Sequence, residues 1–164
     1  MKALGQTDLI GEHGVRKSDL RIRLLGAIDE ASDAPRLAKA FCSPENQERI
    51  EICQKDRSRM MGLLAARPKT PLGDYKACFA EELEALEAEN TGIEAGVSYP
   101  EAFIHPGQTP ATGALNLART VVRRAEREAV AAFEALNIPD ESMLQYLNRL
   151  STLCYLLILA AMPE

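Results

Sequence analysis

The sequence predicts an all-α protein, a five-helix up-and-down bundle, and three observations support that prediction. Aromatic residues make up only 5% of the 164 residues and tryptophan is absent, so the core must be aliphatic. Apolar residues recur at spacings of three and four along several segments, which is the spacing of one helix face. No segment shows a useful length of strand-like alternation, and short connections favour antiparallel neighbours.

The chain is expected to form a single helical domain, 1–164, whose first 18 residues are an N-terminal arm. A chain of this length fits one domain with a sizeable core. Residues 1–18 lack periodicity, and Gly5, Gly11 and Gly14 are typical of a loop or arm.

The first two predicted helices cover residues 19–41 and 44–66. Asp19 suits the N-cap, and Pro44 suits the first helical position because the N–H it lacks would be unpaired there anyway. Pro35 should break or kink the first helix, because proline removes a backbone donor and clashes with the preceding turn.

The other three helices are predicted over residues 75–90, 109–136 and from about 140 to 161. The composition of residues 67–73 predicts a loop before the third helix. Residues 91–110 are rich in glycine and proline, so they are expected to form a second, longer loop.

Composition excludes several classes of function. A net charge of −5 argues against a general nucleic-acid binder, and two histidines, His13 and His105, cannot furnish a multi-histidine metal centre.

The longest apolar run, 153–162, is about half of what spans a bilayer, and the first residues lack a signal peptide's apolar run. The cysteines form no C-x-x-C pair, which favours reduced core thiols in a cytoplasmic protein. They are Cys42, Cys53, Cys78 and Cys154.

Four arginines lie within nine positions of the fourth predicted helix. On a helical wheel, three of them and one glutamate form a stripe about a quarter-turn from the apolar face. Arginine at the edge of a core suits phosphate, because its guanidinium matches an oxyanion bidentately. A solvated face with scattered salt bridges is the alternative. The stripe consists of Arg119, Arg123, Glu126 and Arg127, and Arg124 points further out.

Three segments carry a more specific pattern. They read F-I-H-P-G at 103–107, A-R-T-V-V-R-R-A-E-R at 118–127 and Y-L-N-R-L-S at 146–151. They resemble the F-I-L-P-G-G, A-R-T-x-x-R-R-A-E-R and Y-L-N-R-L-S-D patterns of the PduO-type ATP:cob(I)alamin adenosyltransferases. Residues 11–19 and G-A-I-D-E at 26–30 also resemble the N-terminal half of that family.

The resemblance implies a homotrimer of five-helix bundles with active sites between subunits. Such enzymes bind ATP with Mg²⁺ and a reduced corrinoid, and no residue of this sequence is assigned as a ligand of a resident metal. The cobalt of cob(I)alamin attacks the 5′-carbon of ATP, so the 5′-deoxyadenosyl group is transferred and triphosphate leaves. This chemistry needs cations at the leaving triphosphate and close alignment of cobalt with carbon.

The same resemblance assigns the nucleotide site. Lys17, Arg123 and Arg127 would neutralise phosphate, and Glu126 and Asn148 would orient the nucleotide or its metal. The alternative for Lys17 is a solvated position in the arm.

The remaining roles concern the corrinoid and the subunit interface. Asp29 would pair with Arg119 across the interface and, with Arg123, organise the catalytic site; a purely structural pair is the alternative. Phe103 would fill the space beneath the corrin and favour loss of the lower cobalt ligand, unless it simply packs on the bundle. His105 is expected to be a surface residue.

Several positions depart from the family pattern. Residues 5–11 offer no counterpart of the T-G-D part of the family's phosphate loop. Thr152 stands where the pattern has aspartate, Gln108 where it has glycine, and Leu159 where it has arginine. The alternative is therefore a catalytically degenerate member that binds a corrinoid or other ligand as carrier or regulator. A third hypothesis uses the arginines for subunit contact alone.

Overall fold

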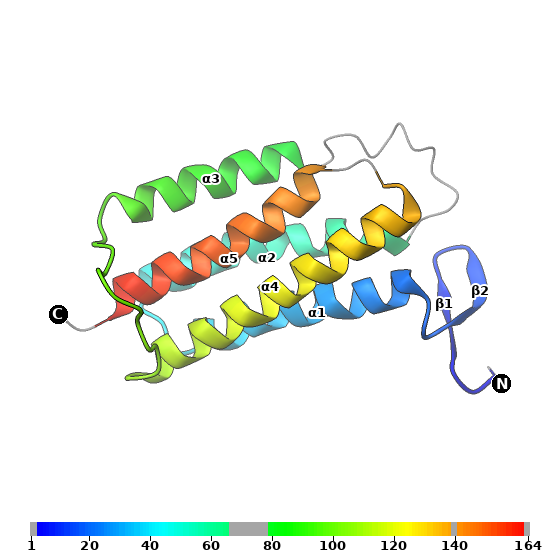
Figure 1. Ribbon diagram of the computed structural model, residues 1–164, viewed down its shortest axis with the longest axis horizontal. Coiled ribbons are helices and arrows are strands. Elements are labelled where there is room, and N and C mark those ends of the chain that lie inside the picture. The colour runs from blue at the N-terminus through cyan, green and yellow to red at the C-terminus, as the bar shows by residue number, and fades with distance from the viewer. Residues whose placement is uncertain (1–2, 66–78, 139–140, 163–164) are drawn as a thin grey trace.

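The computed structural model describes residues 3–65, 79–138 and 141–162 and confirms the helical bundle (Figure 1). Within these residues it has five helices and one two-stranded antiparallel hairpin, in the order β1, β2, α1 to α5. The bounds are β1 Gln6–Leu9, β2 Glu12–Arg16, α1 Leu20–Lys39, α2 Pro44–Ala65, α3 Ala80–Glu94, α4 Pro110–Leu136 and α5 Glu141–Ala161.

The hairpin corrects the prediction that residues 1–18 form an arm without strands. Gln6 pairs with Arg16 across β1 and β2, with an irregularity in register further along β1. Gly11 and Gly14 have φ of 74° and 72°, a region that glycine enters without steric cost, so they allow the turn and the twist. The strands have only 4 and 5 residues, which is too short for alternation to be evident in the sequence.

Arg21 fastens the hairpin to the start of α1. Its Nη1 donates to Glu12 Oε2 on β2 at 2.6 Å, and its Nη2 donates to Asp19 Oδ2 at 2.9 Å. Asp19 is also the N-cap of α1, because its Oδ1 accepts from the Arg21 backbone N–H at 2.9 Å. The Arg21 guanidinium lowers the pKa of Asp19 below its ordinary value of 3.8.

The lowered pKa of Asp19 predicts a pH-dependent contribution to stability. Asn in place of Asp19 still caps the helix but lacks the charge, so Asp19→Asn should reduce the free energy of unfolding by about 1 kcal/mol at pH 7. Because the folded pKa is depressed, the difference should exist above about pH 4 and vanish as pH falls through that pKa. Urea unfolding at pH 7 and pH 3 measures it. Asp33→Asn, at an exposed position of α1, should show neither effect.

The bundle packs α4 between α1 and α5, with α3 against α5 and with α2 against α1 on the side that also faces α5 (Figure 1). Ion pairs of Arg23 with Glu128 and of Arg124 with Glu30 show that α1 and α4 run antiparallel. The predicted core face of α4 is confirmed, because its apolar stripe is almost fully buried. Leu115, Ala118, Val122, Ala125 and Ala129 each have 0% exposure.

Helix α5 is buried on nearly every side. Leu156, Leu157 and Ile158 follow one another and are all 0% exposed, which explains why the sequence is apolar all round there. By length and composition α5 could cross a membrane, yet 56% of its most apolar window is buried within the bundle. That burial is typical of a central helix.

Two helix predictions were wrong in detail. Pro35 does not break α1, which continues to Lys39; Pro35 lies in the last turns and is buried in apolar contacts that offset one lost hydrogen bond. A kink at Pro35 stays a prediction. Helix α3 extends to Glu94, past the predicted end at residue 90. The predicted loop at 67–73 and the predicted helix start at 75 lie outside the described residues.

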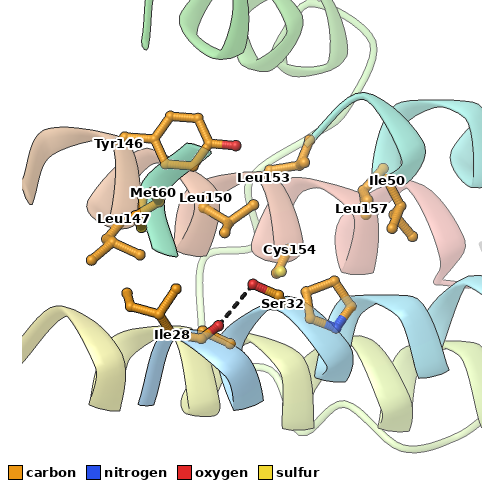
Figure 2. Close-up of a pocket in the computed structure, with 12 residues that line it drawn as sticks. Ile28, Ser32, Ile50, Met60, Tyr146, Leu147, Leu150, Leu153, Cys154 and Leu157 are labelled. Atoms are coloured by element: carbon orange, nitrogen blue, oxygen red, sulfur yellow. Dashed lines mark hydrogen bonds between the residues drawn. The ribbon is translucent and has the colours of Figure 1, made fainter. Parts of the chain in front are cut away.

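A small cavity lies between α1, α2 and α5 (Figure 2). Its volume is about 30 Å³, which is room for about one water and too little for a ligand. Ser32 Oγ on its wall donates to the Ile28 carbonyl at 2.7 Å. Burial raises the pKa of Cys154, also on the wall, to about 12, so this thiol is unreactive. The prediction of buried free thiols is confirmed for Cys42 and Cys154; Cys78 and the side chain of Cys53 are not described.

Candidate functional site

A larger cavity opens between helices α4 and α5 beneath the loop that joins α3 to α4. Its volume is about 600 Å³. Three predicted site residues, Phe103, Arg119 and Arg123, line it together. Its other polar lining groups include Asn116, Glu101, Ser151, Thr152 and Tyr155. We call it the α4–α5 cavity.

The predicted pair of nucleotide residues lies beside this cavity. Asn148 Nδ2 on α5 donates to Glu126 Oε1 on α4 at 2.8 Å, which aligns the two helices. Because α4 and α5 are antiparallel, one turn from this bond brings Arg123 opposite Ser151, and both line the cavity. The structure therefore brings Glu126 and Asn148 into one continuous strip with the arginines.

The start of α4 is fixed by local hydrogen bonds. The Thr109 side chain accepts from the Thr112 backbone N–H at 3.1 Å, a capping box, and Pro110 occupies the first helical position. The Thr112 hydroxyl accepts from the Gly107 N–H at 3.2 Å, and Gly107 has φ of 134°, which favours glycine. These contacts set where α4 begins and so where its arginines lie along the cavity.

The arginines of α4 differ in their surroundings. Arg119 is half-buried, and its Nε donates to Asn116 Oδ1 at 3.2 Å. Arg123 is exposed, and its backbone carbonyl accepts from Arg127 Nη1 at 3.0 Å, so Arg127 folds back along the helix. Arg124 pairs with Glu30 of α1 and is turned from the cavity, as the wheel predicted. Two guanidinium groups and one carboxylate, Glu101, line the cavity, so its wall has an excess of positive charge.

Phe103 stands at the mouth of the cavity rather than in the core. It is 98% exposed, whereas the next residue, Ile104, is partly buried against the bundle. The alternative that Phe103 packs on the bundle is therefore wrong for this chain. His105 is exposed, as predicted, and its carbonyl accepts from Gln108 Nε2 at 2.7 Å.

Lys17 and Asp29 are not brought to the cavity by this chain, and Arg127, one turn beyond Arg123 on α4, is not part of its wall either. Lys17 is exposed between the hairpin and α1, and the hairpin lies at the opposite end of the bundle from the α3–α4 loop (Figure 1). Asp29 is half-buried on α1 and is not part of the cavity wall. The predicted pairing of Asp29 with Arg119 of another subunit stays a prediction.

Sequence reasoning missed four polar residues of the cavity wall: Glu101 on the loop and three residues on helices. Asn116 precedes Arg119 by one helical turn, and Ser151 and Tyr155 follow Asn148 at spacings of three and seven. These spacings put each of the three helical residues on the same helix face as a predicted site residue, so the spacing in the sequence could have identified them.

These features define a class of protein: a helical bundle with an arginine-lined cavity between two helices, suited to an anionic ligand, beneath a loop that presents an exposed aromatic ring. Comparison with known families is more specific. Residues 2–161 match the family model described as cobalamin adenosyltransferase, and the chain belongs to that family.

Named relatives agree with this assignment. The chain is 32% identical over 154 residues to the corrinoid adenosyltransferase PduO of Salmonella typhimurium; the match covers 93% of this chain but only 46% of that protein. It is 34% identical over 169 residues to a corrinoid adenosyltransferase of Mycobacterium tuberculosis, covering 98% of this chain and 85% of the relative. The chain thus spans about half the length of the PduO relative.

A solved structure shares the fold. It is a variant PduO-type ATP:co(I)rrinoid adenosyltransferase from Lactobacillus reuteri complexed with ATP. The TM-score is 0.71 at 26% identity, covering 96% of this chain and 89% of that one. The resemblance inferred from the sequence motifs is therefore confirmed for the family and the fold.

Proposed function

We propose that this protein transfers the 5′-deoxyadenosyl group of ATP to cob(I)alamin and releases triphosphate. One observation carries the proposal: Phe103, expected to contact the corrinoid, and Arg123, expected to bind the triphosphate, line the same cavity. The relatives named corrinoid adenosyltransferases support the same activity.

The reaction needs charge neutralisation more than acid–base chemistry. Cobalt(I) supplies the electron pair of the new cobalt–carbon bond, and the electron pair of the C5′–O bond leaves with triphosphate. Arg123 and Arg127 would neutralise the charge that grows on the leaving oxygen, and guanidinium groups match phosphate oxygens bidentately. Phe103 at the cavity mouth would contact the corrin and favour loss of the lower cobalt ligand.

Glu126 and Asn148 would orient the nucleotide. Their mutual hydrogen bond uses Oε1 of Glu126 and Nδ2 of Asn148 and fixes both side chains. Glu126 Oε2 and Asn148 Oδ1 could then accept from ribose hydroxyls or contact Mg²⁺, which usually keeps several waters and needs only one or two protein oxygens. Among the residues that the structure describes, no group of three His, Cys, Asp or Glu could hold a metal, so Mg²⁺ would arrive with ATP.

The proposal includes a homotrimer with active sites between subunits, in the cytoplasm. The β1–β2 hairpin, which Lys17 directly follows in the chain, lies at the end of the bundle opposite the loop above the cavity (Figure 1). A second copy of the chain would allow Lys17 and Asp29 to reach an α4–α5 cavity that their own chain does not bring to them. Buried free thiols such as Cys42 and Cys154 fit a reducing compartment.

The direct test mixes the purified protein with chemically reduced cobalamin and ATP under anaerobic conditions. Adenosylcobalamin should form, which the absorption spectrum reports, together with one triphosphate for each product molecule. Absence of product at saturating concentrations of both substrates would contradict the proposal.

One observation favours a second candidate, a corrinoid-binding member without ATP chemistry. Thr152, which replaces the aspartate of the family pattern, lies in the cavity wall. A protein of this kind should bind cobalamin in an absorbance titration and show no heat of ATP binding in calorimetry.

A further inference from the structure

The loop that carries Phe103 is anchored differently at its two ends. After Phe103, backbone and side-chain bonds tie Gly107 and Gln108 to the start of α4 and to the loop itself. Before Phe103, residues 98–102 are exposed, so burial does not fix their position. Whatever fixes this first half also decides where the Phe103 ring stands over the cavity.

Tyr99 makes the two contacts that fix the first half. Its hydroxyl donates to Glu94 Oε1, at the end of α3, at 2.7 Å. Its ring lies 6.3 Å from the Tyr155 ring, centroid to centroid, with the planes tilted by 36°. Tyr155 belongs to α5 and lines the α4–α5 cavity, so Tyr99 joins the loop to the end of one helix and to the cavity wall.

These contacts can hold Tyr99 in place although its side chain is 53% exposed. A hydroxyl that donates to a carboxylate forms a charge-assisted bond, which is stronger than a neutral one. The carboxylate of Glu94 also raises the pKa of Tyr99 above its ordinary value of 10.0, a value that already keeps the hydroxyl protonated and able to donate near neutral pH. Paired aromatic rings at this separation add stability beyond the area they bury.

We infer that Tyr99, joined to Glu94 and Tyr155, is a positioning residue that holds the Phe103 loop over the α4–α5 cavity. Tyr99 acts through Phe103 rather than on the reacting atoms. The inference rests on the proposed function for its consequence, corrinoid binding, but the placement of the loop can be measured without any ligand.

The ligand-free test uses fluorine NMR of protein labelled with 4-fluorophenylalanine. The chain has four phenylalanines, and Phe103→Leu assigns the resonance of Phe103. Tyr99→Leu and Glu94→Leu should each shift and narrow the Phe103 resonance, because the loop becomes more mobile. The resonances of Phe79 and Phe133, which are 0% and 3% exposed, should not change.

Two control variants distinguish the hydrogen bond between Tyr99 and Glu94 from the negative charge of a carboxylate on α3. Glu94→Gln keeps an acceptor oxygen and should leave the Phe103 resonance near its original position. Glu84→Leu removes an exposed carboxylate elsewhere on α3 and should have no effect. An unchanged Phe103 resonance in both Tyr99→Leu and Glu94→Leu overturns the inference.

A binding experiment connects the anchor to function. Tyr99→Leu should weaken cob(II)alamin binding by about three- to tenfold, as expected for loss of one charge-assisted bond at an exposed site, and should leave the ATP affinity unchanged. Equal weakening of both ligands, or of neither, contradicts a role specific to the Phe103 loop. If the unaltered protein binds no corrinoid at all, the proposed function fails, and the fluorine resonances still decide whether Tyr99 holds the loop.

Discussion

Replacing Arg123 by alanine should lower kcat/KM for adenosylcobalamin formation by about a hundredfold or more. Arg123 is exposed and lines the α4–α5 cavity, and the helical wheel placed it, with Arg119 and Arg127, on the stripe beside the apolar face. A fixed donor aimed at developing negative charge is worth about 2.7–4 kcal/mol when it is removed, and an equal loss is expected for the departing triphosphate. Steady-state rates with reduced cobalamin and varied ATP measure the change.

The adjacent arginine provides the matched control. Arg124 is also exposed on α4, but it pairs with Glu30 of α1 and does not line the cavity. Arg124→Ala should therefore retain nearly full activity, and both variants should unfold at temperatures close to that of the unaltered protein. Arg123→Lys should recover only part of the rate, because ammonium supplies charge without the guanidinium fork.

The Arg123 result also separates the three hypotheses from the sequence. Unchanged kcat/KM in Arg123→Ala would contradict its role in catalysis. If Arg123→Glu instead dissociates an oligomer without changing ligand binding, the arginines serve subunit contact alone. Sedimentation of the variants distinguishes these outcomes.

The largest effect on stability is expected at Leu157. Leu157→Ala should reduce the free energy of unfolding by about 3–5 kcal/mol, near the upper end for buried leucines. Leu157 is 0% exposed and already borders the cavity of about 30 Å³ between α1, α2 and α5 (Figure 2). The space left by its side chain would join this cavity, so the surrounding groups would recover few of the lost contacts.

Chemical denaturation at 25 °C measures this loss, and Leu37→Ala is its control. Leu37 is 56% exposed on α1, so the same chemical change should alter the free energy of unfolding by about 0.5 kcal/mol or less. A loss below about 1.5 kcal/mol at Leu157 would show that the bundle collapses around the new space, contrary to expectation.

The sequence predicted the helices well and the hairpin not at all. Helical spacing recurs over many residues, so the apolar stripe of α4 and the bounds of α4 and α5 were close to those observed. The hairpin strands have 4 and 5 residues, and their position depends on Arg21 bonding Glu12 nine residues away. At Pro35 the sequence predicted an interruption of the helix that the structure does not have. The rule that proline breaks helices is local and cannot include the apolar contacts that bury Pro35.

For the candidate site, the sequence by itself determined which residues share a helix face. Arg119, Arg123 and Glu126 recur at spacings of three and four, which any helix places on one side. The motifs around them also identified the family, because each motif is a set of particular residue types at fixed spacings along the chain.

Only the tertiary structure decided which faces meet. The bond between Glu126 and Asn148 sets the alignment of α4 with α5, and this alignment brings Thr152 and Tyr155 to the arginine side. Tyr99 has no periodic neighbour that would mark it, and its inferred role follows from its contacts with Glu94 at the end of α3 and with Tyr155 of the cavity wall. Spacing along one helix is local geometry, whereas contact between helices depends on how the whole core packs.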